Sequence, residues 1–353
     1  MIRKSGPLNS FDIAHVAGVS QPTVSRALRN SPRVSEKTRR KIHDIAKQLN
    51  YRVDKNAANL RSQNTKTIAL LIFEDPTLDD SQINPFFLSM LGNITRAASR
   101  KNFDLLVSFQ QLSDDWYSEY ILSHRADGLI LLGYGDYISY REKLNNLSKA
   151  HAPFVIWGPT DKDHPNHYLS CDNQLGGYLA CRHLLELGHR SIGFIGEASE
   201  HCPEFLLRYR GYCQAHEEYG LTPNSQLLQF ADNLETSGFF ACKKLLAAGC
   251  TFTALCAGSD LMAIGAIDAL KRSGKLVPDD VAVVGFDDIL AASQIDPPLT
   301  TIHQNTRLSG ELLVEHLVQL INGRSTQSSL IKPSLVIRKS CGTKKIFENV
   351  RCD

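Results

Sequence analysis

The chain has 353 residues, of which 42% are hydrophobic and 22% are charged, and this composition supports globular cores in two or three domains. Its net charge of +2 hides a split, because residues 1–66 carry 14 Lys and Arg against 4 Asp and Glu, whereas the rest of the chain carries 25 against 33. A basic segment on an acidic body predicts that the segment binds a polyanion.

The apolar runs and the cysteines indicate the cellular compartment of the chain. The longest apolar run, at 68–73, is far too short to cross a bilayer, and the N-terminus shows no signal peptide. The nine cysteines all lie at or after Cys171 and include no C-x-x-C pair. We therefore expect reduced thiols in a cytoplasmic chain and no disulfide framework.

The basic segment predicts three short helices. Ser10 is the expected cap of the first helix, Gly18 supplies a tight turn, and Ser20 is the expected cap of the second helix, with Pro22 in its first turn. A third amphipathic helix follows Ser35. Two short helices joined by a glycine turn and braced by a third predict a helix-turn-helix.

In that motif the second helix enters the major groove of DNA, and its first residues meet base edges. Arg forks onto guanine and Gln onto adenine, so Gln21 and Arg26 are the expected base readers. Hydroxyl and amide side chains suit phosphates, which position a protein without reading sequence. The expected phosphate contacts are Ser20, Thr23, Ser25, Asn30, Ser35 and Thr38.

A linker joins this head to the body. Its helix-capable stretch "NAANLRS" contains one large apolar residue, Leu60. The residues alone leave Leu60 as a side chain that packs against the next domain.

From Thr67 onward, apolar strand-like segments alternate with amphipathic helices in two series. This alternation predicts an α/β body of two similar lobes, each a parallel sheet covered by helices on both faces. Ligands of such sheets bind at the carboxyl ends of the strands, so we expect a small molecule to bind between the lobes.

Motifs for catalysis and cofactor binding do not occur in the sequence. It has no phosphate loop, no G-x-S-x-G elbow and no H-E-x-x-H. The loop "HPNH" at 164–167 is a poor metal site because of its proline. We therefore predict no catalytic residue, no metal and no cofactor.

The head "DIAHVAGVSQPTVSRALRNSPRVSEKTRRKIHDIAKQLNY" resembles the DNA-binding domain of the LacI/GalR family of bacterial transcription regulators. The body segments "RYRGY", "SDLMAIGAIDAL", "VPDDVAVVGFDD" and "PPLTTIHQNTRLSGELLVEHL" resemble the effector-binding core of the same family, which is similar to periplasmic sugar-binding proteins (type I). The resemblance implies a helix-turn-helix domain at 1–55, a hinge helix or linker at 56–66, a core at 67–342 and a tail at 343–353. Within the core it implies an N-lobe at about 67–169 and 301–329, and a C-lobe at about 170–300 and 330–342.

Several side-chain roles follow from the resemblance. A leucine at the place of Leu60 wedges into the minor groove at the centre of the operator, and the short tail favours a dimer over a tetramer. Ser259 stands where an asparagine is common, Gly158 stands where some relatives have an aspartate, and Asp260 is expected to cap the helix that follows it. The implied effector-contacting residues are Phe86, Phe87, Trp157, Arg208, Ser259, Asp287 and Gln304.

The sequence thus predicts a dimeric, sequence-specific transcription regulator, most simply a repressor, that reads a pseudo-palindromic operator. A guanidinium and a carboxylate suit a polyol, so the expected effector is a sugar such as a glucoside or oligosaccharide. A purine effector is the alternative. A sugar-binding transport protein and an enzyme on the same body are the rival classes.

Overall fold

The computed structural model describes residues 8–51, 64–73, 83–110, 115–133, 137–158, 167–249 and 251–342. Its contacts divide the chain into two units, Met1–Thr65 and Lys66–Asp353, which are described separately below as the head and the core. Among the described residues, no helix is long and apolar enough to cross a membrane. Seven of the nine cysteines lie in the described ranges, and all seven are free thiols.

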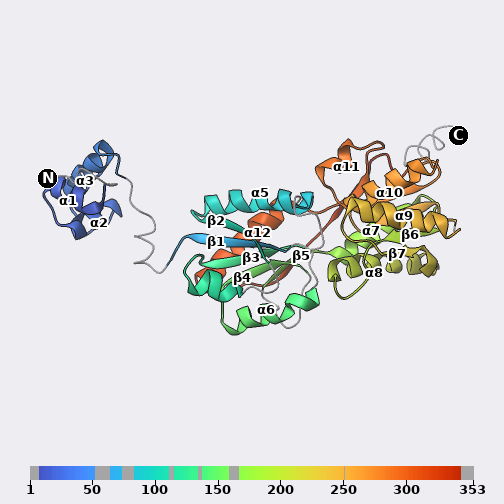
Figure 1. Cartoon of the computed structure of the whole chain (residues 1–353), viewed down its shortest axis with the longest axis horizontal. Helices are drawn as coiled ribbons and strands as arrows, with labels where there is room; N and C mark the ends of the chain where they lie inside the picture. The colour runs from blue at the N-terminus through green and yellow to red at the C-terminus, as the bar shows by residue number, and fades with distance from the viewer. Residues whose placement is uncertain are drawn as a thin grey trace. The chain divides into compact units, whose positions relative to one another are not determined.

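The head consists of three helices, α1 (Ser10–Ala17), α2 (Gln21–Leu28) and α3 (Glu36–Gln48) (Figure 1). Each begins at a local polar signal. The cap of α1 is Asn9, not Ser10 as expected, because the Asn9 side chain accepts from the backbone N–H of Asp12 while the Asp12 carboxylate accepts from that of Asn9. Gly18 ends α1 at a left-handed φ of 70°, which a residue with a Cβ adopts only at a cost.

The expected positions of the other two caps are confirmed, with one difference in contacts. Ser35 accepts from the backbone N–H of Thr38 at the start of α3. Ser20 occupies the N-cap position of α2, but its hydroxyl shares a hydrogen bond of 2.9 Å with the Thr23 hydroxyl and makes no cap bond. The three helices enclose a small apolar core, in which the fully buried side chains are Ile13, Val24, Ala27 and Ile42.

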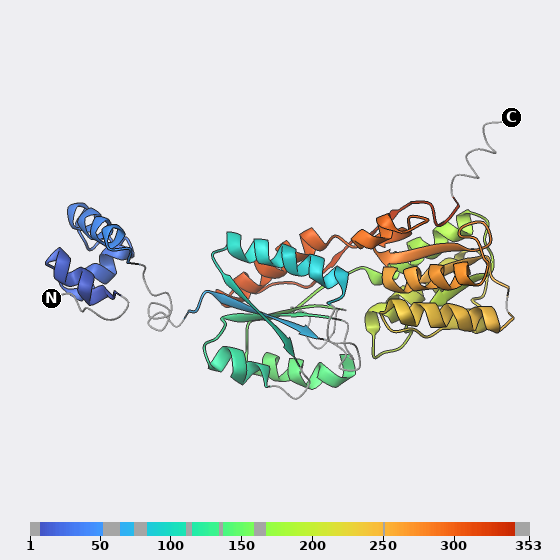
Figure 2. The same ribbon diagram turned by 45° about the horizontal axis from the view of Figure 1, so that its top comes forward.

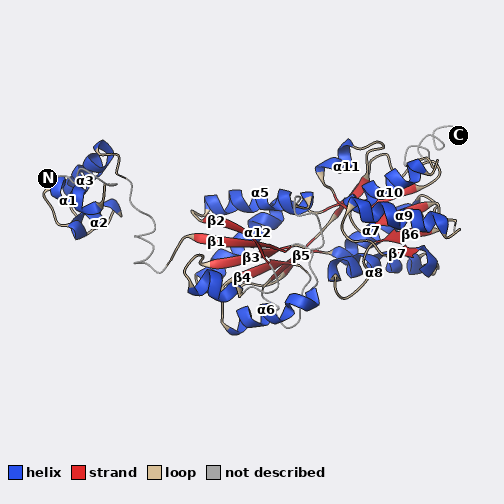
Figure 3. Cartoon of the chain, viewed as in Figure 1, coloured by secondary structure: helices blue, strands red, loops and turns tan. Residues whose placement is uncertain are grey.

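The core unit contains two six-stranded sheets. The first has the order β11-β5-β4-β3-β1-β2 and is parallel throughout, and the second has the order β12-β10-β9-β8-β6-β7 with only β12 antiparallel. Figure 3 shows the strands of each lobe as an inner layer with helices outside it. The first lobe is built from β1 (Thr67–Phe73), α5 (Pro85–Arg100), β2 (Asp104–Gln110), the π-helix η1 (Tyr117–Leu122), β3 (Gly128–Leu132), α6 (Tyr137–Lys149), β4 (Phe154–Trp157), β5 (Tyr168–Cys171), α12 (Thr306–Ile321) and β11 (Ser329–Ile331).

The second lobe repeats the pattern. Its elements are α7 (Asn173–Glu186), β6 (Ile192–Ile195), α8 (Pro203–Glu218), the 3-10 helix η2 (Ser225–Leu227), β7 (Leu228–Gln229), α9 (Glu235–Ala247), β8 (Ala254–Ala257), α10 (Asp260–Arg272), β9 (Ala282–Asp287), α11 (Leu290–Gln294), β10 (Thr300–His303) and β12 (Ser334–Val336). The chain therefore crosses between the sheets after β5, β10 and β11 (Figure 2). Strands β5 and β11 lie in the first sheet and β10 in the second, so all three crossings come a few residues later than the expected 169/170, 300/301 and 329/330.

Helices cover both faces of the second sheet, and a glycine lets α7 and α8 approach unusually closely. A Cβ on Gly176 of α7 would meet the Phe286 ring, whereas one on Gly285 would meet Asp260 of α10, so α7 and α10 lie on opposite faces. A Cβ on Gly211 of α8 would come within 2.0 Å of the Gln174 carbonyl oxygen on α7. The close approach of these two backbones fixes the rest of α8 against α7.

Candidate functional site

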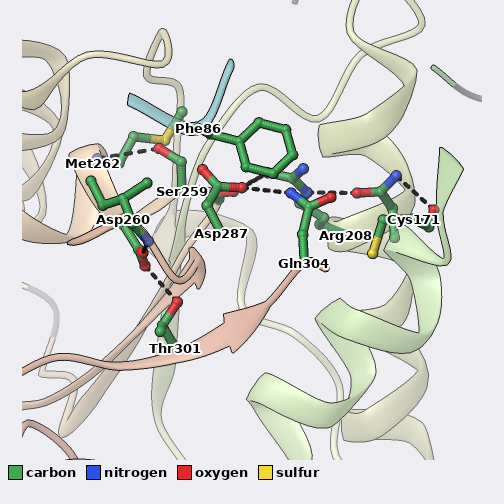
Figure 4. Close-up of polar contacts among 12 residues, drawn as sticks. Phe86, Cys171, Arg208, Ser259, Asp260, Met262, Asp287, Thr301 and Gln304 are labelled. Atoms are coloured by element: carbon green, nitrogen blue, oxygen red, sulfur yellow. Dashed lines mark hydrogen bonds and ion pairs between the residues drawn. The ribbon is translucent and has the colours of Figure 1, made fainter. Parts of the chain in front are cut away.

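Three of the predicted effector residues form a buried chain where the two lobes meet. The Gln304 amide donates to Asp287 Oδ1 at 2.7 Å, and Arg208 Nη1 lies 3.7 Å from the same oxygen (Figure 4). Asp287 is the last residue of β9, Gln304 follows β10, and Arg208 lies on α8. All three are at most 3% exposed. We call this set the interlobe chain.

The Arg208 guanidinium contacts hydrogen-bond acceptors and aromatic rings. Its Nε donates to Asn173 Oδ1 at 2.9 Å, and its Nη1 donates to the carbonyl oxygen of Gly258 at 2.5 Å. The guanidinium carbon also lies 3.8 Å from the centroid of the Phe286 ring and 4.7 Å from that of Phe205. Rings and acceptors together compensate a buried guanidinium for its lost water.

Asp287 is costly to keep in this position. Burial raises the pKa of its carboxyl to about 6, although Arg208 and Gln304 both act in the opposite direction. Its backbone φ is 119°, a region that residues with a Cβ rarely adopt. An ionisable group in a strained, buried position is typical of a functional site.

The cap of the helix α10 is Ser259, not Asp260 as the sequence suggested. The N-cap of α10 is Ser259, whose hydroxyl accepts from the backbone N–H of Met262 at 3.3 Å. Asp260 is not the cap, because its carboxylate accepts from the Thr301 hydroxyl at 2.5 Å and from the backbone N–H of Ile289 at 2.9 Å. Burial and the nearby Asp287 raise the pKa of Asp260 well above its ordinary value. Asp260 thus ties α10 to β10 and to the loop after β9.

The three predicted aromatic residues lie together in the first lobe. Phe86 and Phe87 begin α5, whose cap Asn84 accepts from the backbone N–H of Phe86 at 2.9 Å. The Phe86 ring lies 5.2 Å from that of Phe87 and 6.2 Å from that of Trp157, which ends β4. All three are buried, and they belong to one apolar cluster with Phe205 and Phe286 of the second lobe.

Sequence reasoning missed one buried acidic residue at this junction, Glu204. It lies in the first turn of α8 and is only 5% exposed. A Cβ on Gly158, just after β4, would lie 3.6 Å from Glu204 Oε1, so this carboxylate reaches from the second lobe to the first. An acidic residue in the first turn of a helix normally compensates the helix dipole at the surface, and for that reason it gave no signal in the sequence.

On the head, Arg26 is exposed on α2, as a base reader must be. Gln21 is half-buried, and its amide donates to the Ser10 hydroxyl at 3.1 Å, which ties the start of α2 to α1. The predicted phosphate contacts are exposed or half-buried, and each also has a partner within the head. The Ser25 hydroxyl accepts from Arg29, Asn30 Oδ1 contacts His43, and Ser20 and Ser35 pair with Thr23 and Thr38.

Three further predictions fall partly or wholly outside the described residues. Leu60, the predicted minor-groove wedge, lies outside them, as do His164, Pro165 and Asn166 of the "HPNH" loop and the tail after residue 342. His167 is described, and its Nδ1 lies 2.8 Å from the Phe154 carbonyl oxygen. Within the described ranges, no group of three His, Cys, Asp or Glu side chains is arranged to hold a metal.

Comparison with known proteins finds a match for each of the two units. Residues 11–54 match the family model for bacterial regulatory proteins of the lacI family, and residues 181–341 match a periplasmic binding protein-like domain. The chain is 32% identical to the HTH-type transcriptional repressor PurR of Mannheimia succiniciproducens over 95% of this chain and 98% of that one. It is 30% identical to the HTH-type transcriptional regulator GalR of Escherichia coli over 95% of this chain and 96% of that one.

Solved structures agree with the sequence relatives. The Lac repressor dimer bound to operator and the anti-inducer ONPF matches with a TM-score of 0.82 and 27% identity over 95% of this chain and 99% of that one. The complex of the transcriptional regulator CelR with cellobiose matches with a TM-score of 0.71 and 28% identity over 94% of this chain and 99% of that one. These relatives are regulators of transcription, so the prediction that the chain is not an enzyme is confirmed. The chain belongs to the LacI family of bacterial regulatory proteins and is a DNA-binding transcriptional repressor.

Proposed function

We propose that the chain is a homodimeric, cytoplasmic repressor that binds a pseudo-palindromic operator, and that a carbohydrate bound between its lobes controls its affinity for the operator. Each head reads one half-site, and the half-sites lie about one helical turn, roughly 34 Å, apart. Arg26 and Gln21 are the proposed base readers. The Lac repressor, whose solved structure is a dimer on its operator, supports the dimer.

The observation that carries the effector proposal is the interlobe chain. A sugar hydroxyl both donates and accepts, so it exchanges hydrogen bonds equally well with the Arg208 guanidinium and with the Asp287 carboxylate. The rings of Phe86 and Trp157 add apolar surface of the kind that packs against a pyranose face. Phe87, Ser259 and Gln304 complete the proposed contact set.

Neighbouring structures support a carbohydrate. They include a CelR–cellobiose complex, a Lac repressor bound to ONPG, and a LacI-family regulator from Enterococcus faecium with bound ribose. The effector acts only through its different affinity for two arrangements of the protein, and such couplings are worth about 1–3 kcal/mol. We therefore expect operator affinity to change about 5- to 150-fold.

A purine is the second candidate effector. The buried rings of Phe86 and Trp157 offer faces on which a flat base stacks, and the amide of Gln304 presents both a donor and an acceptor. The relatives named PurR favour this alternative.

One experiment tests both parts. A random duplex pool is passed over the purified full-length protein at physiological salt, and the bound sequences are identified. We expect an enriched pseudo-palindrome whose affinity then changes when a sugar panel is titrated against it. If duplexes were retained without any enriched sequence, the proposed base readers would be refuted. A response to adenine or hypoxanthine but to no sugar would refute the carbohydrate in favour of the purine.

A further inference from the structure

Glu204 occupies a place that is unusual for an acidic side chain. It follows Pro203 in the first turn of α8, and only 5% of it is exposed. Its Oε1 lies 3.6 Å from the point where Gly158 would carry a Cβ, at the carboxyl end of β4 in the other lobe. In parallel sheets that end of a strand is where ligands bind. The carboxylate is therefore delivered to the ligand-facing edge of the first lobe.

The surroundings of Glu204 provide little compensation for its burial. Arg208 acts on the Glu204 carboxyl through its positive charge, but this does not offset the effect of burial. Burial consequently raises the pKa of Glu204 to about 7. Since burying an ionisable carboxyl is expensive, a fold keeps one at the ligand-facing edge of a sheet chiefly where the carboxyl has a function.

The balance of charge at the junction sets the kind of ligand. Two buried carboxyl groups, those of Glu204 and Asp287, interact with one buried guanidinium, and a third, that of Asp260, lies near Asp287. That guanidinium, Arg208, already contacts Asp287, Asn173 and the carbonyl of Gly258. An incoming phosphate or carboxylate would therefore meet like charge, whereas a hydroxyl or an amine would find acceptors.

Building on the proposed function, we propose that Glu204 is an effector-contacting residue that accepts hydrogen bonds from a neutral or amino sugar, and that the acidic junction excludes phosphorylated and uronic sugars. The carboxylate reaches the end of β4 from α8, so a glycine suffices at position 158. A ligand held between Glu204 on one lobe and the aromatic residues Phe86 and Trp157 on the other then bridges the two lobes.

Matched probes test the ligand class. At pH 8, cellobiose, ribose, glucose, glucosamine, glucose 6-phosphate and glucuronate are each titrated into the full-length protein, and binding is followed by isothermal calorimetry and by the emission of the two tryptophans, of which Trp157 lies at the proposed site. We expect binding by at least one neutral or amino sugar and at least 100-fold weaker binding by its charged counterpart. Preference for the phosphate or the uronate would overturn the inference. A panel in which nothing binds would overturn the proposed carbohydrate itself.

Matched variants test the residue. Glu204→Gln is expected to weaken the best probe at least tenfold. Glu217→Gln, the same change at an exposed position of the same helix, is expected to stay within twofold of wild type. Adding Gly158→Asp to Glu204→Gln returns a carboxylate to the same place from the opposite lobe, where a Cβ makes only ordinary contacts, and is expected to recover part of the affinity.

The outcomes separate the two proposals. Unchanged affinity in Glu204→Gln, with a sugar that still binds, would overturn the role of Glu204 and leave the carbohydrate proposal intact. A loss of affinity in Glu204→Gln that the added Gly158→Asp does not reverse at all would assign Glu204 to support of the fold instead of ligand contact. Recovery by the double variant supports a direct contact.

Discussion

Replacing Glu204 with glutamine should make the protein without effector more stable, which is unusual for a change at a buried polar position. In the folded chain its pKa is raised from 4.5 to about 7 by burial. Between these two values the folded state holds a proton that the unfolded state has lost, so stability falls as pH rises through this window. Above about pH 7 the full cost of ionising the buried carboxyl is present.

The magnitude follows from the difference between the two pKa values. Each pKa unit corresponds to about 1.4 kcal/mol, so the rise from 4.5 to about 7 corresponds to ~3 kcal/mol of destabilisation at pH 8. Glutamine has nearly the same shape and does not ionise. We therefore expect Glu204→Gln to raise the free energy of unfolding by up to ~3 kcal/mol at pH 8 and by less than ~1 kcal/mol at pH 5.

Urea unfolding followed by circular dichroism at pH 5 and pH 8 measures this difference. The quantity of interest is the change in stability between the two pH values, because the titration of Asp287 and Asp260 contributes to wild type and variant alike. Glu217→Gln is the control, and its stability should follow wild type at both pH values. If Glu204→Gln lost as much stability as wild type between pH 5 and pH 8, the reasoning from burial would be refuted.

Three other changes probe the head, the interlobe chain and the packing of the core. Arg26→Ala should reduce the preference for operator over random duplex about 10- to 100-fold in a competition assay while the melting of the head stays unchanged, and equal selectivity would remove Arg26 as a reader. Asp287→Asn should abolish the response to effector in a DNA-binding titration but leave operator affinity in its absence within a few-fold of wild type; a normal response would place the effector elsewhere. Gly211→Ala should destabilise the core by about 1–3 kcal/mol or more, because its Cβ would overlap the backbone of α7, whereas Gly92→Ala on α5, where the space is open, should be neutral or stabilise by up to ~1 kcal/mol; similar values for both would contradict the close packing of α7 on α8.

The order of elements could be predicted from the sequence because it depends on signals that repeat over many residues. Apolar runs such as 68–73 and 128–132 form buried strands, and segments with helical periodicity between them form the covering helices. An error of one residue in such a pattern changes little. The helices of the head could be predicted for the same reason, because Val24 and Ala27 lie at helical spacing, and both are fully buried.

Details that depend on one residue could not be predicted as well. Asn9 and Ser10 are both good caps, as are Ser259 and Asp260, and only the backbone conformation of each pair decides which residue is the cap. Glu204 was missed for a related reason. Its burial depends on how close α8 comes to the end of β4, a distance that no local pattern encodes.

The departures from ordinary packing gather at one place, and this distribution argues that the junction is where the protein works. Asp287 has an unfavourable φ of 119°, the carboxyl groups of Glu204 and Asp287 are buried there, and the Arg208 guanidinium lies against the rings of Phe205 and Phe286. Each of these costs stability, and none is needed to hold a parallel sheet together. The sheets themselves are apolar and regular, so the free energy gained from their burial offsets the cost of the polar groups at the junction. A site that existed only for structure would show the opposite, because selection for stability would replace such charges with apolar side chains of similar size.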